Sequence, residues 1–246
     1  MRRDAPGRLP IVVRRIDGGP SVVVEDASLL AHAFFTRDPS SVGPEAYDQR
    51  AGRGELNRIT TDDVRTINQT MRARSRHTAW ETLTSAGPLP WLAILDPSWD
   101  LIELPDRDWQ RLGCTELLEA VFAAALGPYR NHAVATKVLH LKRPLLIPIL
   151  DSLVVEQIGG GERTPPIDLV LHLRAEGKRN RIALRQVQAS LGEAGITRPL
   201  VRILDVLLWS GHPAAGLKAL IGWERVIRPA SGTTPATEAD LLGSDA

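Results

Sequence analysis

The sequence lacks most of the residues and segments from which a function is commonly assigned. It contains a single cysteine, Cys114, which excludes an internal disulfide, a cysteine-rich zinc site and a four-cysteine iron–sulfur cluster. Its six histidines form no pair at a metal-ligand spacing such as HExxH. We therefore expect a protein that uses neither a metal nor another cofactor.

Long apolar segments are also missing. No hydrophobic run reaches the roughly 18 residues that a membrane-spanning helix needs. The basic N-terminal segment MRRDAPGRLPIVVRRIDGG has no apolar stretch of the length found in secretion signals. These absences predict a cytoplasmic protein that does not enter a membrane. The 246 residues, 43% of them hydrophobic, suffice for one large globular domain with a small extension.

Charge is unevenly distributed, although the net charge is only +1. Residues 126–228 contain 15 lysines and arginines against 8 acids, whereas residues 1–125 contain 15 against 18. A basic half beside a near-neutral half is compatible with nucleic-acid binding through one face. An arginine-rich solvated surface explains the same distribution, and charge alone does not choose between the two.

The pattern of apolar residues predicts a mostly α-helical protein, an orthogonal bundle with a small N-terminal β-hairpin. Two β-branched runs flanking Asp17-Gly18-Gly19-Pro20 indicate the hairpin, within an extension of residues 1–36. Residues 37–228 should form the helical domain, with loop at 37–57 and 86–106, and 229–246 a disordered tail. Helices are predicted over 60–75, 77–85, 116–126, 133–143, 152–158, 167–175, 182–195 and 199–209, followed by a short amphipathic piece at 213–226. Thr60 should cap the first of these helices and Thr115 the third.

Asp151 stands between the apolar run LLIPIL and an apolar helix. At a helix N-cap, a carboxylate is stabilised by free backbone N–H groups and by the helix dipole, so a purely structural cap is one interpretation. The other is a carboxylate at the mouth of a pocket that stabilises developing positive charge or activates a nucleophile. Both can hold at once.

Lys137 lies near the edge of the apolar stripe that Val134, Val138 and Leu141 form on their helix. Lysines in such positions usually extend their ammonium to solvent. A lysine that cannot do so can serve instead as an amine nucleophile that forms a Schiff base. The sequence leaves both roles open.

The segment 131–157 resembles the helix-hairpin-helix DNA glycosylase superfamily, which includes 8-oxoguanine and endonuclease III-type enzymes. Residues 132–137, HAVATK, occupy the place of the family's hairpin P-G-V-G-x-K, and residues 147–151, IPILD, occupy that of its V-P-V/I-D segment. Residues 57–64 and 202–209 are similar to features of an actinobacterial branch of the superfamily. The resemblance is close over 131–157 and loose over 47–210.

The resemblance implies a monomeric DNA N-glycosylase that excises a damaged or modified base, in DNA repair or in defence against modified foreign DNA. Asp151 would stabilise the oxocarbenium-like sugar, and Lys137 would attack C1′ in a member that also cleaves the strand. The hairpin residues that would contact DNA are His132, Ala133, Ala135 and Thr136. His140, Lys142 and Arg143 would extend the same basic face.

Two departures from the family pattern bear on this expectation. Ala133 and Ala135 replace both hairpin glycines, whose missing side chains allow backbone N–H groups to approach a DNA phosphate. The spacing from Lys137 to Asp151 is 14 residues, shorter than in better-known members. The two side chains still converge if Pro144 and the proline within IPILD turn the chain.

Other residues would complete such a site. A flipped base needs aromatic or apolar surfaces, for which Trp91, Trp99 and Trp109 are the candidates. The densest basic cluster includes Lys178, Arg179 and Arg181 and would contact phosphates, although a solvated helix start explains it equally well. Asp205, among apolar residues, should pair with Arg202 or another nearby arginine.

Three hypotheses follow from the sequence. The first is the glycosylase. The second is a catalytically inactive DNA-binding module with the same fold, which the missing hairpin glycines favour. The third is a structural or regulatory protein in which Lys137 and Asp151 form a buried ion pair. The first predicts a pair that opens to solvent, and the third a sealed one.

Overall fold

The computed structural model describes residues 9–36, 44–126, 131–161 and 163–215. In this part of the chain the protein is mostly helical, with a two-stranded antiparallel sheet at the N-terminal end, as the sequence predicts. The elements are β1 Ile11–Val13, β2 Val22–Val24, α1 Ala27–Phe35, α2 Pro44–Arg50, α3 Thr61–Met71, η1 His77–Trp80, α4 Glu81–Ser85, α5 Pro90–Ala93, α6 Asp106–Arg111, α7 Cys114–Ala125, α8 His132–Lys142, α9 Ser152–Gln157, α10 Pro166–Arg179, α11 Arg181–Glu193 and α12 Leu200–Gly211.

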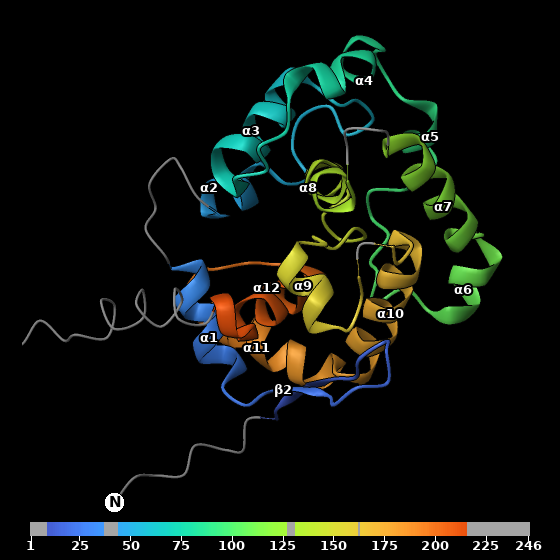
Figure 1. The fold of residues 1–246 in the computed structure, drawn as a ribbon. Helices are drawn as coiled ribbons and strands as arrows, with labels where there is room; N and C mark the ends of the chain where they lie inside the picture. Colours follow the sequence, from blue (N-terminus) through green and yellow to red (C-terminus); the bar gives the residue numbers. More distant parts are fainter. Residues whose placement is uncertain (1–8, 37–43, 127–130, 162, 216–246) are drawn as a thin grey trace, which may run out of the picture.

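The helices form two groups that meet at α8 and α9 (Figure 1). Helices α2–α7 surround α8, whereas α1 joins α9–α12 and the hairpin. Helix α1 packs against α11 and α12, so the second group is built from both ends of the chain. This packing corrects the expected division at residue 36, because α1 belongs to the helical body and not to the N-terminal extension.

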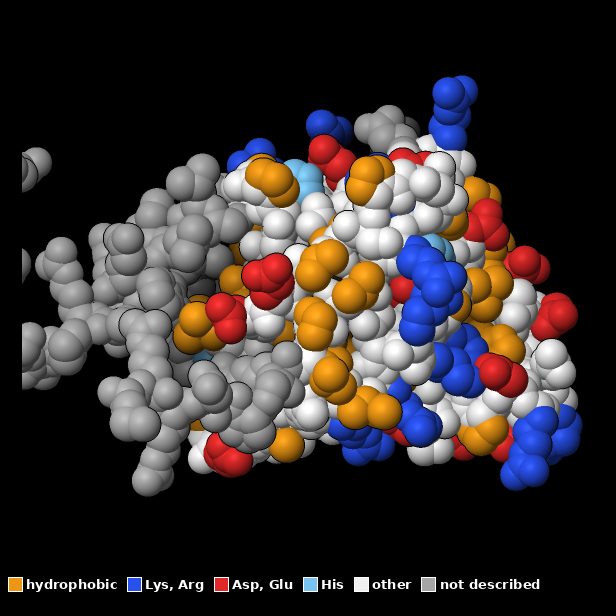
Figure 2. Space-filling model, turned by 90° about the horizontal axis from the view of Figure 1, so that it is seen from below, with side chains coloured by type: hydrophobic (Ala, Val, Ile, Leu, Met, Phe, Trp, Pro, Cys, Tyr) orange, Lys and Arg blue, Asp and Glu red, His pale blue; other side chains and the backbone are white. Residues whose placement is uncertain are grey.

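The hairpin docks on the second group through its first strand. Asn180 both accepts from the backbone N–H of Val12 at 2.9 Å and donates to its carbonyl at 2.7 Å. Ile16 donates its N–H to the Ile158 carbonyl at the end of α9, at 2.8 Å. The outer face of the sheet carries exposed Val12 and Val23, and Figure 2 shows apolar side chains scattered over this lower side of the molecule.

Helix α8 occupies the centre of its group because it is buried on almost every side. Nine of its residues are buried, including Lys137, His140 and Lys142. A helix enclosed all round needs internal partners for its polar side chains. The site described below arises from those partners.

Capping residues explain the ends of the helices that position the site. Thr60 and Asp63 form a reciprocal capping box at the start of α3, which confirms the predicted threonine cap. Asp151 caps α9, also as predicted. Thr115 does not cap α7, which begins at Cys114 after Gly113; its hydroxyl accepts instead from the Trp109 indole at 2.9 Å.

The loop predicted at 37–57 contains helix α2, which corrects that prediction. Proline at the first position suits a helix start, and the buried Tyr47 anchors the helix against α8. The expected amphipathic piece at 213–226 lies largely outside the described residues, and the predicted tail at 229–246 lies wholly outside them. Within the described residues, the helices are too short or too polar to cross a membrane.

Candidate functional site

Lys137 and Asp151 meet where the two groups of helices join. The Lys137 Nζ lies 3.1 Å from Asp151 Oδ2, although 14 residues separate them in the chain. The other carboxylate oxygen of Asp151, Oδ1, accepts from the Leu153 backbone N–H at 3.2 Å, which makes Asp151 both an ion-pair partner and the cap of α9. The chain therefore turns back after α8 as the predicted convergence requires.

The two members of the pair differ in their access to solvent. The Lys137 side chain is 7% exposed and that of Asp151 is 26% exposed. The Lys137 Nζ also lies 3.4 Å from the Met71 carbonyl, a backbone acceptor at the end of α3. A molecule arriving from solvent reaches the carboxylate before the amine. The pair is thus neither a fully open site nor a sealed one.

Hydrogen bonds on both sides hold this geometry. The Tyr47 hydroxyl donates to the Lys137 carbonyl at 2.6 Å and fixes α2 against α8. The Thr136 hydroxyl accepts from the Leu150 N–H at 3.1 Å and donates to the His132 carbonyl at 2.7 Å. The bond between Thr136 and Leu150 joins the residue before Lys137 to the residue before Asp151. Asp151 therefore has a fixed position relative to Lys137.

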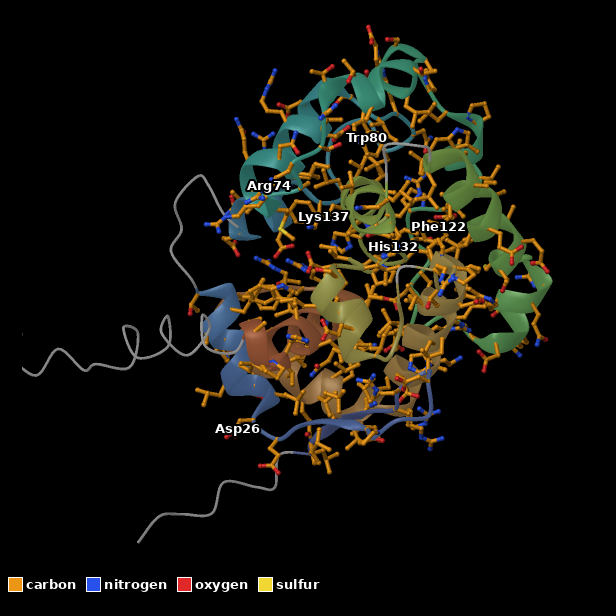
Figure 3. All side chains as sticks on the ribbon, in the orientation of Figure 1. Asp26, Arg74, Trp80, Phe122, His132 and Lys137 are labelled. Carbon is orange, nitrogen blue, oxygen red and sulfur yellow. The ribbon has the colours of Figure 1, made fainter. Side chains whose placement is uncertain are left out.

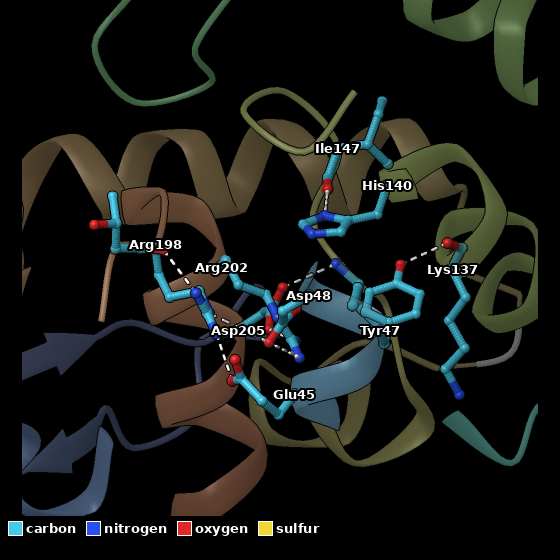
Figure 4. A network of polar contacts seen from close by, with 11 residues as sticks. Glu45, Tyr47, Asp48, Lys137, His140, Ile147, Arg198, Arg202 and Asp205 are labelled. Atoms are coloured by element: carbon cyan, nitrogen blue, oxygen red, sulfur yellow. Dashed lines mark hydrogen bonds and ion pairs between the residues drawn. The ribbon is translucent and has the colours of Figure 1, made fainter. Parts of the chain in front are cut away.

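A buried polar network lies to one side of Lys137 (Figure 4). His140 donates from Nδ1 to the Ile147 carbonyl at 2.6 Å, and Asp205 accepts from the Ile149 N–H at 3.1 Å. Arg202 bonds Asp205 at 2.6 Å, as predicted, and Asp48 at 2.8 Å. The network anchors both ends of the segment 147–149, which leads directly to Asp151.

Two groups in this network have strongly shifted pKa values. Burial, reinforced by the nearby charge of Arg202, lowers the pKa of His140 to about 3. Burial raises the pKa of Asp205 to about 7, against the opposing attraction of Arg202 and the hydrogen bond from Ile149. His140 is therefore neutral in the folded protein at neutral pH.

These shifts predict opposite contributions to the pH dependence of stability. Stability that depends on neutral His140 is lost as pH falls from about 6.5 towards 3, because the unfolded chain binds the proton more readily. Stability linked to Asp205 is fully present below the ordinary aspartate pKa of 3.8 and is lost as pH rises from there through about 7. Between pH 7 and 5, His140 and Asp205 each change the free energy of unfolding by about 2 kcal/mol, with opposite signs.

Urea unfolding at pH 5 and pH 7 would separate the two contributions. When the pH falls from 7 to 5, the free energy of unfolding of His140→Gln should rise by about 2 kcal/mol relative to that of the wild type. That of Asp205→Asn should fall by about as much. Because each comparison is between pH values for one variant, the stability lost through the substitution itself cancels. Identical pH slopes for the wild type and both variants would contradict the assigned shifts.

Most of the α8 residues expected to contact DNA are buried, which corrects that prediction. Residues 132–137 form the first turns of α8 and not a hairpin, and residues 127–130 before them lie outside the described part of the chain. Only His132 and Ala133 are partly exposed. The residues that are buried and cannot reach a phosphate are Ala135, Thr136, His140, Lys142 and Arg143.

Lys142 and Arg143 have structural partners instead. The Lys142 ammonium lies 2.6 Å from the Asp63 carboxylate of the α3 capping box. Arg143 donates to the carbonyls of Leu92 and Leu95, each at 2.6 Å, and to Leu56 at 2.8 Å. A buried guanidinium with these acceptors holds the loops around α5 together, which explains why it sits inside the protein.

The basic cluster on α10 and α11 is largely paired with acids. Asp106 accepts from Lys178 at 2.5 Å and from Arg174 at 2.6 Å. Arg179 pairs with Glu176, and Arg181 lies 3.7 Å from Glu103. Acidic neighbours offset part of their charge, so these residues form an ion-pair network between helices.

The predicted base pocket does not form around the three tryptophans. Trp109 is 6% exposed, and the Arg174 guanidinium stacks over its ring at 4.2 Å, so this residue belongs to the core. Trp91 and Trp99 are partly buried and pack against the same core. Trp91 lies in α5, which packs on α7, away from the junction of α3, α8 and α9.

Two features of the junction escaped the sequence-based prediction. One is Tyr47, whose helix was expected to be loop. The other is the segment after α3, where Arg72, Arg74 and Arg76 are exposed immediately beyond Met71. Arginines alternate with small residues in the segment MRARSRH, which is a signal in the sequence. Counting charge over all of residues 1–125, which are net acidic, averages this local signal out.

No metal site is evident in the described residues, which contain no group of three or more His, Cys, Asp or Glu that could hold an ion. Cys114 is buried, and burial raises the pKa of its thiol. At the junction, Lys137 and Asp151 supply one carboxylate and the amine behind it.

A family model described as "Family of unknown function (DUF6308)" matches residues 27–212. The match covers most of the sequence, so the chain belongs to the DUF6308 family. It extends from α1 to the end of α12 and includes Lys137, Asp151 and the buried polar network, but not the hairpin. No curated protein and no solved structure matches the chain.

Proposed function

We propose that this member of the DUF6308 family is a DNA N-glycosylase-like enzyme that excises a damaged or modified base. The observation that carries the proposal is the convergence of Lys137 and Asp151 at 3.1 Å, with the carboxylate 26% exposed at the start of α9. The resemblance of residues 131–157 to helix-hairpin-helix glycosylases supports the same assignment.

In this proposal Asp151 is the catalytic residue. The bond between the base and C1′ breaks, its electron pair leaves with the base, and positive charge develops on the sugar. The carboxylate stabilises that charge, and water then adds to C1′ and releases a proton. A carboxylate at a helix N-cap is held in place by backbone N–H groups, so it is positioned before the substrate arrives.

Lys137 fits a positioning role better than a nucleophilic one. Its side chain is 7% exposed, lies behind the carboxylate and donates to it. To attack C1′, the amine would have to leave Asp151 and give up a proton. The geometry therefore favours hydrolysis of the base alone, and strand cleavage through a Schiff base would require the pair to open.

A panel of duplexes that each carry one modified base tests the proposed activity directly. We expect at least one of them to acquire abasic sites, detected by strand cleavage in hot alkali. Binding of the panel without base release would favour the second candidate, an inactive DNA-binding module. That alternative is supported by the low exposure of Lys137 and by the alanines that replace the hairpin glycines.

Borohydride trapping tests the role of Lys137. Because the amine is paired and buried, we expect no covalent complex with DNA from the wild-type protein. Lys178→Gln serves as a control for the loss of a lysine charge. A trapped complex that forms with the wild type and with Lys178→Gln, but not with Lys137→Gln, would contradict the positioning role and establish the Schiff-base route.

A further inference from the structure

The exposed arginines after α3 stand beside the Lys137–Asp151 pair. Met71, whose carbonyl lies 3.4 Å from the Lys137 amine, directly precedes Arg72. Figure 3 shows Arg74 at the end of α3 near Lys137. Among the described residues, the side chains of Arg72, Arg74 and Arg76 have no hydrogen-bond or ion-pair partner. The basic cluster on α10 and α11, in contrast, is paired with acids.

Hydrogen bonds fix the backbone that carries these arginines. The Asn68 side-chain amide donates to the Ser75 carbonyl and accepts from its N–H, each at 2.8 Å. The Trp80 indole donates to the Ser75 hydroxyl at 2.7 Å. Ala73 and Ser75 are partly buried, whereas the arginines that alternate with them are exposed. The segment is therefore ordered before any ligand binds, which lowers the entropic cost of binding.

Fold stability does not explain arginine at these positions. Arg72 and Arg74 both have left-handed backbone conformations, with φ of 49° and 51°. Glycine or asparagine adopts this conformation more readily, and another residue costs about 1 kcal/mol. Since their side chains also make no polar contact with the described protein, the three cations are available to a ligand.

The surrounding surface strengthens the positive charge. Residues 50–76 contain seven arginines against three acids. Arg50 and Arg65 share the single carboxylate of Asp62, at 2.6 and 3.1 Å, which leaves them a net positive charge. Asp63 is already bound to Lys142 inside the protein. A basic surface therefore leads from α2 and α3 to the junction that contains Asp151.

We propose that Arg72, Arg74 and Arg76 bind backbone phosphates of a DNA strand and hold it beside Asp151. This inference rests on the proposed function, whose substrate it would position. The guanidinium group donates a planar fork of hydrogen bonds that matches a phosphate, and three of them on a fixed segment suit a repeating anion. Such contacts carry no base specificity, so they bind the strand whichever base is excised.

Salt titration of binding to an unmodified DNA duplex tests the proposal. The triple variant Arg72→Gln/Arg74→Gln/Arg76→Gln should reduce the slope of log K against log salt by about 2 to 3, because each lost phosphate contact removes about 0.9. Affinity at low salt should fall by at least about tenfold. Arg185 belongs to the same paired cluster, since its guanidinium lies 3.0 Å from Glu103. The matched control Lys178→Gln/Arg181→Gln/Arg185→Gln removes the same charge from this cluster and should change the slope much less.

A triple arginine-to-lysine variant at positions 72, 74 and 76 should retain most of the slope, since the charges remain. An unchanged slope in the glutamine variant, an equal loss in the control, or wild-type protein that binds no DNA would overturn the inference. Preference for an RNA duplex of the same sequence would also overturn it. Arginine-dependent binding without base release would refute only the proposed function, whereas base release with an unchanged slope would refute only this inference.

Discussion

Asp151→Asn is expected to slow base release by about 100- to 1000-fold, the loss seen when one electrostatic stabiliser is removed from an active site. Asparagine is as good an N-cap as aspartate, so α9 should keep its start. The substitution removes the negative charge that faces the developing sugar cation, and it leaves Lys137 without an ionic partner. The amide oxygen of asparagine can still accept a hydrogen bond from the Lys137 amine, so we expect the variant to fold, with some stability lost through the buried ammonium.

Single-turnover release of the base identified in the duplex panel measures this effect, with urea unfolding in parallel. Asp168→Asn is a matched control, because Asp168 is an exposed aspartate in the first turn of α10, far from Lys137 in the sequence. The control should release the base at the wild-type rate. Full activity in Asp151→Asn would show that the carboxylate is only a helix cap.

Arg202→Met should lower the free energy of unfolding by about 3 to 5 kcal/mol, the usual cost of breaking a buried ion pair by removing one partner. Arg202 bonds Asp205 at 2.6 Å and Asp48 at 2.8 Å, and the side chains of both acids are 2% exposed. Without the guanidinium, two buried carboxylates must become protonated or draw in water. Asp205 also holds the Ile149 N–H, so the segment before Asp151 should loosen.

Urea denaturation at pH 7 measures this loss. Arg65→Met is a suitable control because Arg65 pairs with Asp62 on α3, where both side chains are more than half exposed, and its removal should cost about 1 kcal/mol or less. Arg202→Met/Asp205→Asn should recover part of the stability, since only one of the two buried carboxyl groups then lacks its cation. A loss below about 1 kcal/mol in Arg202→Met would show that the network does not support the fold.

Several local features followed from the sequence because nearby residues decide them. The threonine cap of α3, the aspartate cap of α9 and the N-terminal hairpin depend on short-range hydrogen bonds and on residues with a strong positional preference. The pairing of Arg202 with Asp205 spans three positions on one helix face, so helical periodicity sufficed.

The sequence did not predict which lysines and arginines are exposed and free of acidic partners. Lys142 and Arg143 look like surface cations in the sequence but are buried, because Asp63 and the carbonyls near α5 converge on them from distant segments. Arg179 and Arg181 look free but face Glu176 and Glu103. Whether a cation is available depends on neighbours that are remote in the chain, and sequence spacing does not identify them.

The Lys137–Asp151 pair separates what the sequence determines from what only the tertiary structure determines. The sequence by itself determined that Asp151 begins a helix and that Lys137 lies on a preceding one, because caps and apolar periodicity are local properties. Only the tertiary structure decided that the side chains meet, that Asp151 is the more exposed member and that arginines with no partner among the described residues stand beside them. These outcomes depend on how α3, α8 and α9 pack together, since burial and electrostatic partners are properties of the packed molecule.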